Sequence, residues 1–70
     1  MRIMLAPVGQ QAKIGAMSLD AEVKKRLTDI GVAVGADVEV ISNSGGSLVL
    51  DVLGVRVALN RDVAMKIRVA

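Results

Sequence analysis

The sequence contains no cysteine, no histidine and no aromatic residue. Without cysteine it can form neither a disulfide nor a thiolate that serves as nucleophile or zinc ligand. Without histidine it lacks the side chain that titrates near neutral pH and the commonest metal ligand. Without phenylalanine, tyrosine or tryptophan it has no platform for stacking nucleobases and no aromatic groove for proline-rich peptides. Most catalytic and recognition chemistries are therefore excluded before any motif is considered.

Aliphatic side chains dominate what is present. The chain has 70 residues, of which 53% are hydrophobic, including twelve valines, seven leucines and five isoleucines. A chain of this length buries only about 60% of its unfolded surface, so its stability is marginal. Because β-branched residues favour strands, we expect a mainly β fold that forms a single domain over residues 1–70. The aliphatic surplus also predicts some apolar surface, as a docking patch or an oligomer contact.

The charges are few and of mixed sign. Nine basic and seven acidic side chains leave a formal net charge of +2. No apolar run approaches the 18 or so residues that a membrane span needs, so none is expected. Residues 1–8 are apolar but too short for the core of a signal peptide. The sequence therefore predicts a soluble, cytoplasmic protein.

The first third of the chain predicts an extended segment and a strand. Residues 1–9 are expected to be extended up to a turn at Val8-Gly9, since Pro7 cannot donate to a sheet ladder. Residues 11–16 alternate between polar and apolar, which indicates a half-buried strand, and Gly15 marks a bulge or bend in it. The side chains expected to point inward are Ala12, Ile14 and Ala16.

One helix follows, capped by Ser18 or Asp20 and ending near Ile30. Its apolar stripe has the spacing of a helix and consists of Leu19, Val23, Leu27 and Ile30. Two favourable i,i+4 ion pairs are predicted, Asp20 with Lys24 and Glu22 with Arg26. Gly31 stands where a left-handed residue ends a helix, and Val32 can supply the accompanying apolar contact. A turn over residues 33–36 comes next, in which Gly35 supplies the positive φ.

Four more short strands are predicted, over residues 37–41, 48–52, 55–59 and 66–69. A flexible hairpin loop over 42–47 and a tight turn at Leu53-Gly54 connect the first three. Asn60 caps a short helical turn over 62–65. The side chains expected to face the core are Val38, Val40, Leu48, Leu50, Val52, Val55, Val57, Leu59, Ile67 and Val69. Five short strands favour closure into a small barrel, because closure removes exposed sheet edges.

No catalytic residue, metal ligand set or cofactor is predicted. The carboxylates fall at outward positions or helix starts, where solvated charge explains them; they are Asp20, Glu22, Asp29, Asp37, Glu39, Asp51 and Asp62. The serines have no histidine to act as their base. Neither glycine-rich stretch, at 31–35 or 44–47, matches a phosphate-binding or dinucleotide motif, and turn geometry accounts for both. An enzyme is not expected.

The basic run Lys24-Lys25-Arg26 is the local concentration of charge that most suggests a binding role. It can be a solvated helix face paired with the acidic residues Asp20 and Glu22. It can also be a docking surface for an acidic partner or for nucleic acid. Without aromatic residues, binding to nucleic acid would rest on phosphate contacts alone and would be weak and sensitive to salt.

Four stretches of the chain together resemble the FeoA family of small ferrous iron transport proteins; they are residues 8–9, 25–41, 52–59 and 64–69. The most specific is RLTDIGVAVGADVEVI over residues 26–41, which is similar to the family's Arg-Leu-x-Asp-Met-Gly-Leu-x-Pro-Gly-x-x-Val-x-Val. Val34 stands where the family usually has proline, and residues 45–47 stand where it often has Gly-Asp-Pro. The same domain type resembles the C-terminal module of some metal-dependent repressors.

The resemblance implies an SH3-like barrel of five strands with one inserted helix. It implies a non-enzymatic, cytoplasmic accessory protein of bacterial ferrous iron uptake, whose partner is FeoB, the membrane GTPase that moves Fe²⁺. The residues expected to contact that partner lie on the helix: Lys24, Lys25, Arg26 and Thr28, with Leu27 as a packing residue whose loss would disturb the same face. A small nucleic-acid-binding barrel and an oligomerisation module remain as alternatives.

Overall fold

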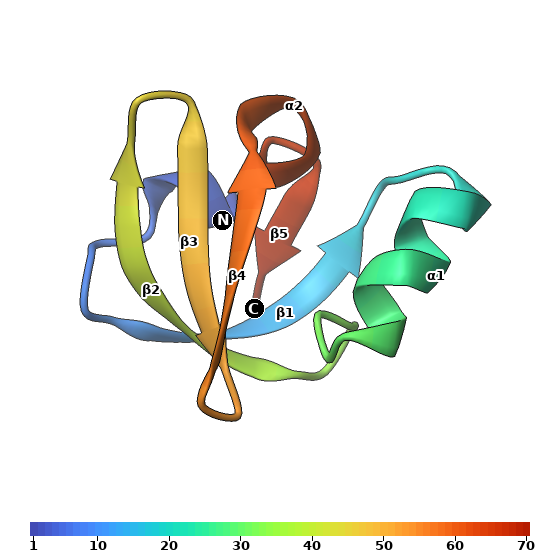
Figure 1. Ribbon diagram of the computed structural model, residues 1–70, viewed down its shortest axis with the longest axis horizontal. Coiled ribbons are helices and arrows are strands. Elements are labelled where there is room, and N and C mark those ends of the chain that lie inside the picture. Colours follow the sequence, from blue (N-terminus) through green and yellow to red (C-terminus); the bar gives the residue numbers. More distant parts are fainter.

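The computed structural model describes every residue, Met1–Ala70, and its five strands form one antiparallel sheet (Figure 1). The elements in chain order are a 3₁₀ turn Ile3–Leu5, β1 Gln11–Met17, α1 Ala21–Asp29, β2 Asp37–Ser44, β3 Ser47–Val52, β4 Val55–Asn60, α2 Arg61–Ala64 and β5 Ile67–Val69. The strand order across the sheet is β4-β3-β2-β1-β5. The prediction of a mainly β fold with one inserted helix and a short helical turn before the last strand is confirmed.

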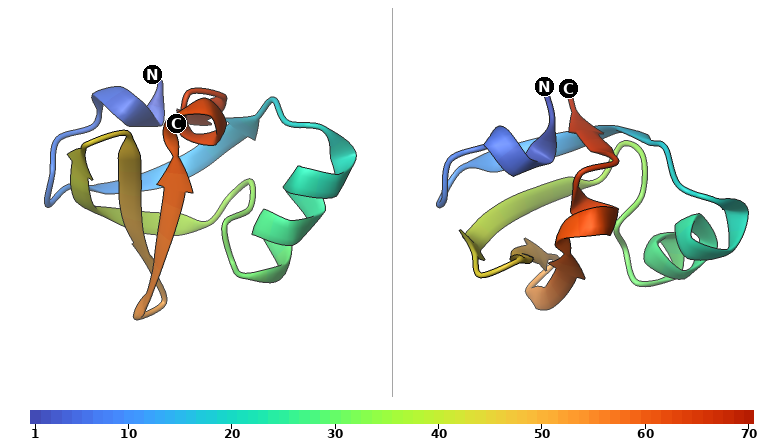
Figure 2. Two further views of the ribbon diagram at one scale, coloured as in Figure 1. Left: turned by 45° about the horizontal axis from the view of Figure 1, so that its top comes forward. Right: turned by 90° about the horizontal axis from the view of Figure 1, so that it is seen from above.

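The sheet curls around its core without closing. Figure 2 shows it bending so that the strands surround a common interior. The edge strands β4 and β5 do not pair with each other, so the expected barrel is open along one seam. Fifteen residues are buried and all are apolar: Ile3, Ala6, Ile14, Met17, Leu27, Val32, Val38, Val40, Leu48, Leu50, Val52, Leu59, Ala64, Ile67 and Val69. The inward positions predicted on the central strands β2 and β3 are confirmed.

The N-terminal segment differs from the extended form that we predicted. Backbone hydrogen bonds from Leu5 N to Arg2 O and from Ala6 N to Ile3 O close a 3₁₀ turn. A 3₁₀ turn places residues three apart on the same side, and both Ile3 and Ala6 are buried. The segment therefore covers part of the core, which a fully extended one would not do with this spacing.

The bulge predicted at Gly15 is confirmed. The register between β1 and β5 shifts between Ile14 and Ala16. The extra residue lets Ile14 and Met17 both point inward although they are three positions apart. Strict alternation without a bulge would point Met17 outward, so the sequence did not predict its burial.

The loop predicted over residues 42–47 is much shorter in the structure. The strands β2 and β3 run up to a two-residue turn, Gly45-Gly46, at which φ is +61° and +82°. Two positive φ values define the turn type that matches the twist of a hairpin, and glycine adopts them without strain. A register shift between Val40 and Ser42 lets the strand continue past position 41.

Two side chains that we predicted to be buried are exposed. Val55 lies opposite Val52 on the inner face of the sheet, yet 60% of it is accessible, because it is the first residue after the turn, at the end of the edge strand β4; Leu59, further along the same strand, is buried. Ile30 is 51% accessible because it follows the last helical residue, where the chain turns away. In both cases the spacing identified the correct face of the element, but no other part of the chain covers the side chain.

The tight turn between β3 and β4 contains the one non-glycine residue with a positive φ, Leu53 at +54°. Its side chain is 94% exposed, so it has little packing to lose. We expect Leu53→Asn to raise the free energy of unfolding by about 0.5–1 kcal/mol, because asparagine tolerates this conformation and Asn-Gly suits the turn. Leu53→Ala, which keeps the strain, should be near neutral. Urea unfolding followed by circular dichroism measures both, and equal stability of the two variants would contradict the strain.

Candidate functional site

The candidate partner surface lies on α1, which stands at one side of the curled sheet (Figure 1). The helix begins where Asp20 accepts a hydrogen bond from the backbone N of Val23, over 3.1 Å, so the predicted cap is Asp20 and not Ser18. Leu27 is buried and Val23 half-buried, and they attach the helix to the core. The opposite faces of α1 are open to solvent.

The C-terminal end of α1 is fixed as the sequence predicted. Gly31 has a φ of +99°, and its N donates to the O of Thr28. The N of Val32 donates to the O of Leu27 over 2.8 Å, and the Val32 side chain is fully buried. This pair of bonds is the Schellman arrangement, which satisfies two carbonyls that the helix leaves unpaired. The end of α1 is thereby anchored to the core through Val32.

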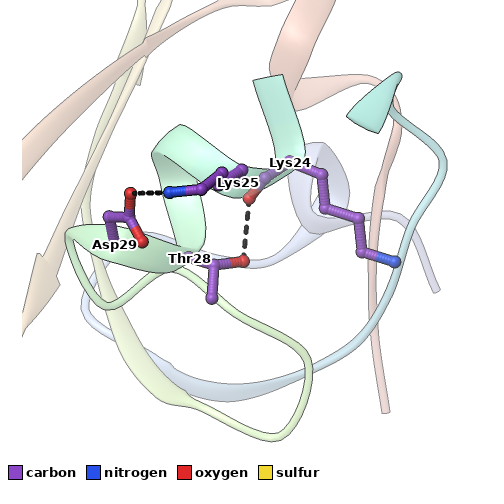
Figure 3. Close-up of polar contacts among 4 residues, drawn as sticks. All are labelled: Lys24, Lys25, Thr28 and Asp29. Carbon is purple, nitrogen blue, oxygen red and sulfur yellow. Dashed lines mark hydrogen bonds and ion pairs between the residues drawn. The ribbon is translucent and has the colours of Figure 1, made fainter. Parts of the chain in front are cut away.

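The five predicted contact residues have different surroundings. Lys25 Nζ lies 3.1 Å from an Asp29 carboxylate oxygen (Figure 3). The hydroxyl of Thr28 donates to the backbone O of Lys24 over 2.8 Å in the same view. Arg26 is paired instead with Glu22, at 2.8 Å, as predicted. Leu27 is the packing residue we expected.

Lys24 is the one cation of α1 without an ion pair. The predicted pair with Asp20 does not form, since the Asp20 carboxylate oxygen caps the helix instead. In Figure 3 the Lys24 side chain extends away from the ion pair between Lys25 and Asp29. Its charge is therefore available to an outside group without breaking any internal pair.

The basic run does not form one continuous basic patch. Residues two apart on a helix do not face each other, so Lys24 and Arg26 lie on opposite flanks of α1. Three acidic residues balance the three basic ones; they are Asp20, Glu22 and Asp29. The structure brings Lys24 and Thr28 together on one flank, and it holds Lys25 and Arg26 beside carboxylates.

A second basic group was missed by the sequence analysis. Arg2 and Arg68 lie opposite each other in an isolated β-bridge between the two ends of the chain. Arg2 and Lys66 also line a shallow hollow together with Asp62 and Met65. No sequence signal could have found this group, since Arg2 is more than sixty positions from Lys66 and Arg68 and meets them only because β5 lies beside the N-terminal segment.

No group of three or more acidic side chains gathers in a way that could hold a metal ion. Neither helix is long and apolar enough to cross a lipid bilayer.

Comparison with known proteins gave consistent matches. The FeoA domain family matches residues 1–70. A protein from Methanocaldococcus jannaschii named as an Fe(2+) transport protein A is 27% identical over 67 residues, which are 96% of this chain and 82% of that protein.

Solved structures show the same fold. The solution structure of an FeoA protein from Chlorobium tepidum superposes with a TM-score of 0.86 at 22% identity, covering 99% of this chain and 68% of that one. A crystal structure titled as an iron uptake regulatory protein, FeoA, gives 0.86 at 18% identity, covering 99% and 93%. A manganese-dependent transcriptional repressor gives 0.87 at 16% identity, covering all of this chain but 40% of the repressor. At these identities the structures establish the SH3-like fold and nothing more.

Proposed function

The chain belongs to the FeoA family of ferrous iron transport accessory proteins, and from that membership we propose that it binds a FeoB-type iron transporter. The proposed contact is with the cytosolic GTPase part of that transporter, so the chain acts in the cytoplasm. It performs no reaction of its own and influences transport by binding alone. The observation that carries the proposal is the family match over the full length of the chain.

The exposed side of α1 supports the choice of surface. The helix is held at both ends, by the Asp20 cap and by the Gly31-Val32 anchor, so the backbone that carries its outer side chains has a fixed position. A preorganised surface loses less conformational entropy on binding than a flexible one. Lys24 and Thr28 then offer a free ammonium and a hydroxyl on neighbouring turns.

The charge arrangement on α1 favours an acidic partner surface. Complementary charges speed association and exclude wrong partners more than they add affinity. Lys24 can pair with a partner carboxylate at no internal cost, and Lys25 and Arg26 add positive potential that their own carboxylates partly offset. Nucleic acid is less well supported as a ligand, since α1 with its cap carries no net charge and the chain only +2.

A charge reversal on α1 tests the proposal. The double variant Lys24→Glu/Lys25→Glu should lower affinity for the transporter's cytosolic part by about tenfold or more, because two attractive contacts become repulsive. Both side chains are exposed, so folding should be retained. Retention of the chain by the immobilised cytosolic part measures the effect.

The matched control is Lys66→Glu/Arg68→Glu, a reversal of two charges in the second basic group. We expect it to bind as the wild type does. Equal retention of the wild type and the double variant would remove α1 from the account, and a failure of the wild type to be retained would contradict the proposed partner.

A further inference from the structure

The two edges of the sheet are protected to different degrees. The free side of β5, only three residues long, is covered by the N-terminal segment: Val69 N donates to Met1 O over 2.7 Å, and Arg2 bridges Arg68. The strand β4 has six residues in regular register with β3, without a bulge or a proline. No backbone hydrogen bond joins its middle residues to any element other than β3.

The register identifies the backbone groups that β4 leaves unpaired. Next to a two-residue hairpin turn, alternate opposed pairs exchange hydrogen bonds. Here these pairs are Val52–Val55, Leu50–Val57 and Leu48–Leu59. The N–H and C=O groups of Arg56 and Ala58, which lie between them, therefore point away from β3 and into solvent.

The side chains do little to protect this edge. Natural sheets guard their edges with charges, prolines, bulges or very short strands. In β4 the one charge is Arg56, and its neighbour Val55 is 60% exposed on the inner face, at the turn end of the strand. Such an edge is a template for another strand.

We propose that β4 binds β4 of a second copy of this chain, as an antiparallel pair around a two-fold axis at Val57. In this register Arg56 of each copy lies opposite Ala58 of the other, and the four outward groups on each strand can form four hydrogen bonds between the copies. Val55 of each copy lies opposite Leu59 of the other, which covers its exposed side chain. A two-fold interface uses the same surface on both copies, as this one does.

Charge repulsion and the position of α2 select that register over its two neighbours. An axis at Arg56 would place the two arginines directly opposite each other, which is unfavourable. An axis at Ala58 would place Arg56 opposite Asn60, whose side chain caps α2, and would bring that helix against the second strand. The pairing at Val57 avoids both, so the strand is complementary to itself in one register. This inference goes beyond the proposed function and uses a surface distinct from α1 (Figure 1).

Two matched substitutions at one exposed position test the register. Ala58→Glu places a carboxylate opposite Arg56 of the second copy, twice in each dimer, whereas Ala58→Lys places an ammonium there. Cross-strand pairs of this kind predict a dimer about three- to tenfold tighter than wild type for Ala58→Glu, and one weaker by a similar factor for Ala58→Lys. Sedimentation over a range of concentrations measures both dissociation constants.

Amide hydrogen exchange gives a second readout that needs no substitution. As the concentration rises, exchange should slow at the amides of Arg56 and Ala58, while those of Val55 and Val57, already bonded to β3, should change little. A chain that stays monomeric up to about 1 mM would overturn the proposal. So would a dimer in which Ala58→Glu and Ala58→Lys shift the equilibrium alike, or in which the slowed amides lie outside β4. Because α1 takes no part, these results are independent of transporter binding.

Discussion

Leu50→Ala is expected to lower the free energy of unfolding by about 2–5 kcal/mol, which brings the chain close to its unfolding midpoint at 25 °C. Leu50 is fully buried on the central strand β3. Truncating such a leucine costs about 2–5 kcal/mol, through lost burial and the cavity left behind. A core of this size, with no disulfide or metal to support it, supplies only about 3–5 kcal/mol of stability. The substitution therefore removes most or all of the margin.

Urea unfolding followed by far-ultraviolet circular dichroism measures this loss, since the chain has no aromatic fluorophore. The matched control is Val55→Ala, an aliphatic truncation at a position that is 60% exposed, and we expect it to change stability by about 0.5 kcal/mol or less. A loss below about 1 kcal/mol for Leu50→Ala would contradict the packing described for the core.

Gly31→Ala should lower the free energy of unfolding by about 1–3 kcal/mol, because two penalties coincide there. The φ of +99° is unfavourable for any residue with a side chain, and the new Cβ would lie 3.0 Å from Cγ1 of Val52. Relief of that contact requires the Val52 side chain or the end of α1 to shift. Transporter binding through α1 should weaken together with stability.

Gly35→Ala is the control that separates the two penalties. Gly35 has a similar φ of +91°, but a Cβ there would meet nothing within 4 Å. We expect it to show the loss from backbone strain alone, measured by the same urea unfolding. A loss at Gly31 no greater than that at Gly35 would contradict the packing of this end of the helix against Val52.

Local signals predicted local structure well. The positive φ values at Gly31 and Gly35 follow from the backbone freedom of glycine, and the bulge at Gly15 lies where a Cβ would approach the N of Ala70 to 3.3 Å. The inward residues of β2 and β3 follow from strict alternation, since both strands lie inside the sheet with neighbours on each side. The errors arise where a neighbour decides the outcome. Alternation placed Val55 on the inner face, but it could not show that no other part of the chain covers the turn end of β4.

In the candidate site, too, local contacts could be predicted from the sequence and contacts that depend on other parts of the chain could not. Helical spacing correctly predicted the ion pair of Glu22 with Arg26. The predicted ion pair of Asp20 with Lys24 does not form, because the Asp20 carboxylate caps the helix instead. The bridge between Arg2 and Arg68 joins the two ends of the chain, so no local pattern could indicate it. Whether α1 contacts a partner is a property of two proteins and stays a prediction.

The most direct test is a nuclear magnetic resonance titration of the ¹⁵N-labelled chain with the cytosolic part of a FeoB-type transporter. The account predicts that the amide signals of residues 24–28 shift or broaden first. The amide signals of β4 should change only if transporter binding alters the self-association of the chain. A map in which residues 24–28 remain unperturbed while the transporter binds elsewhere, or in which no signal changes at all, would contradict it.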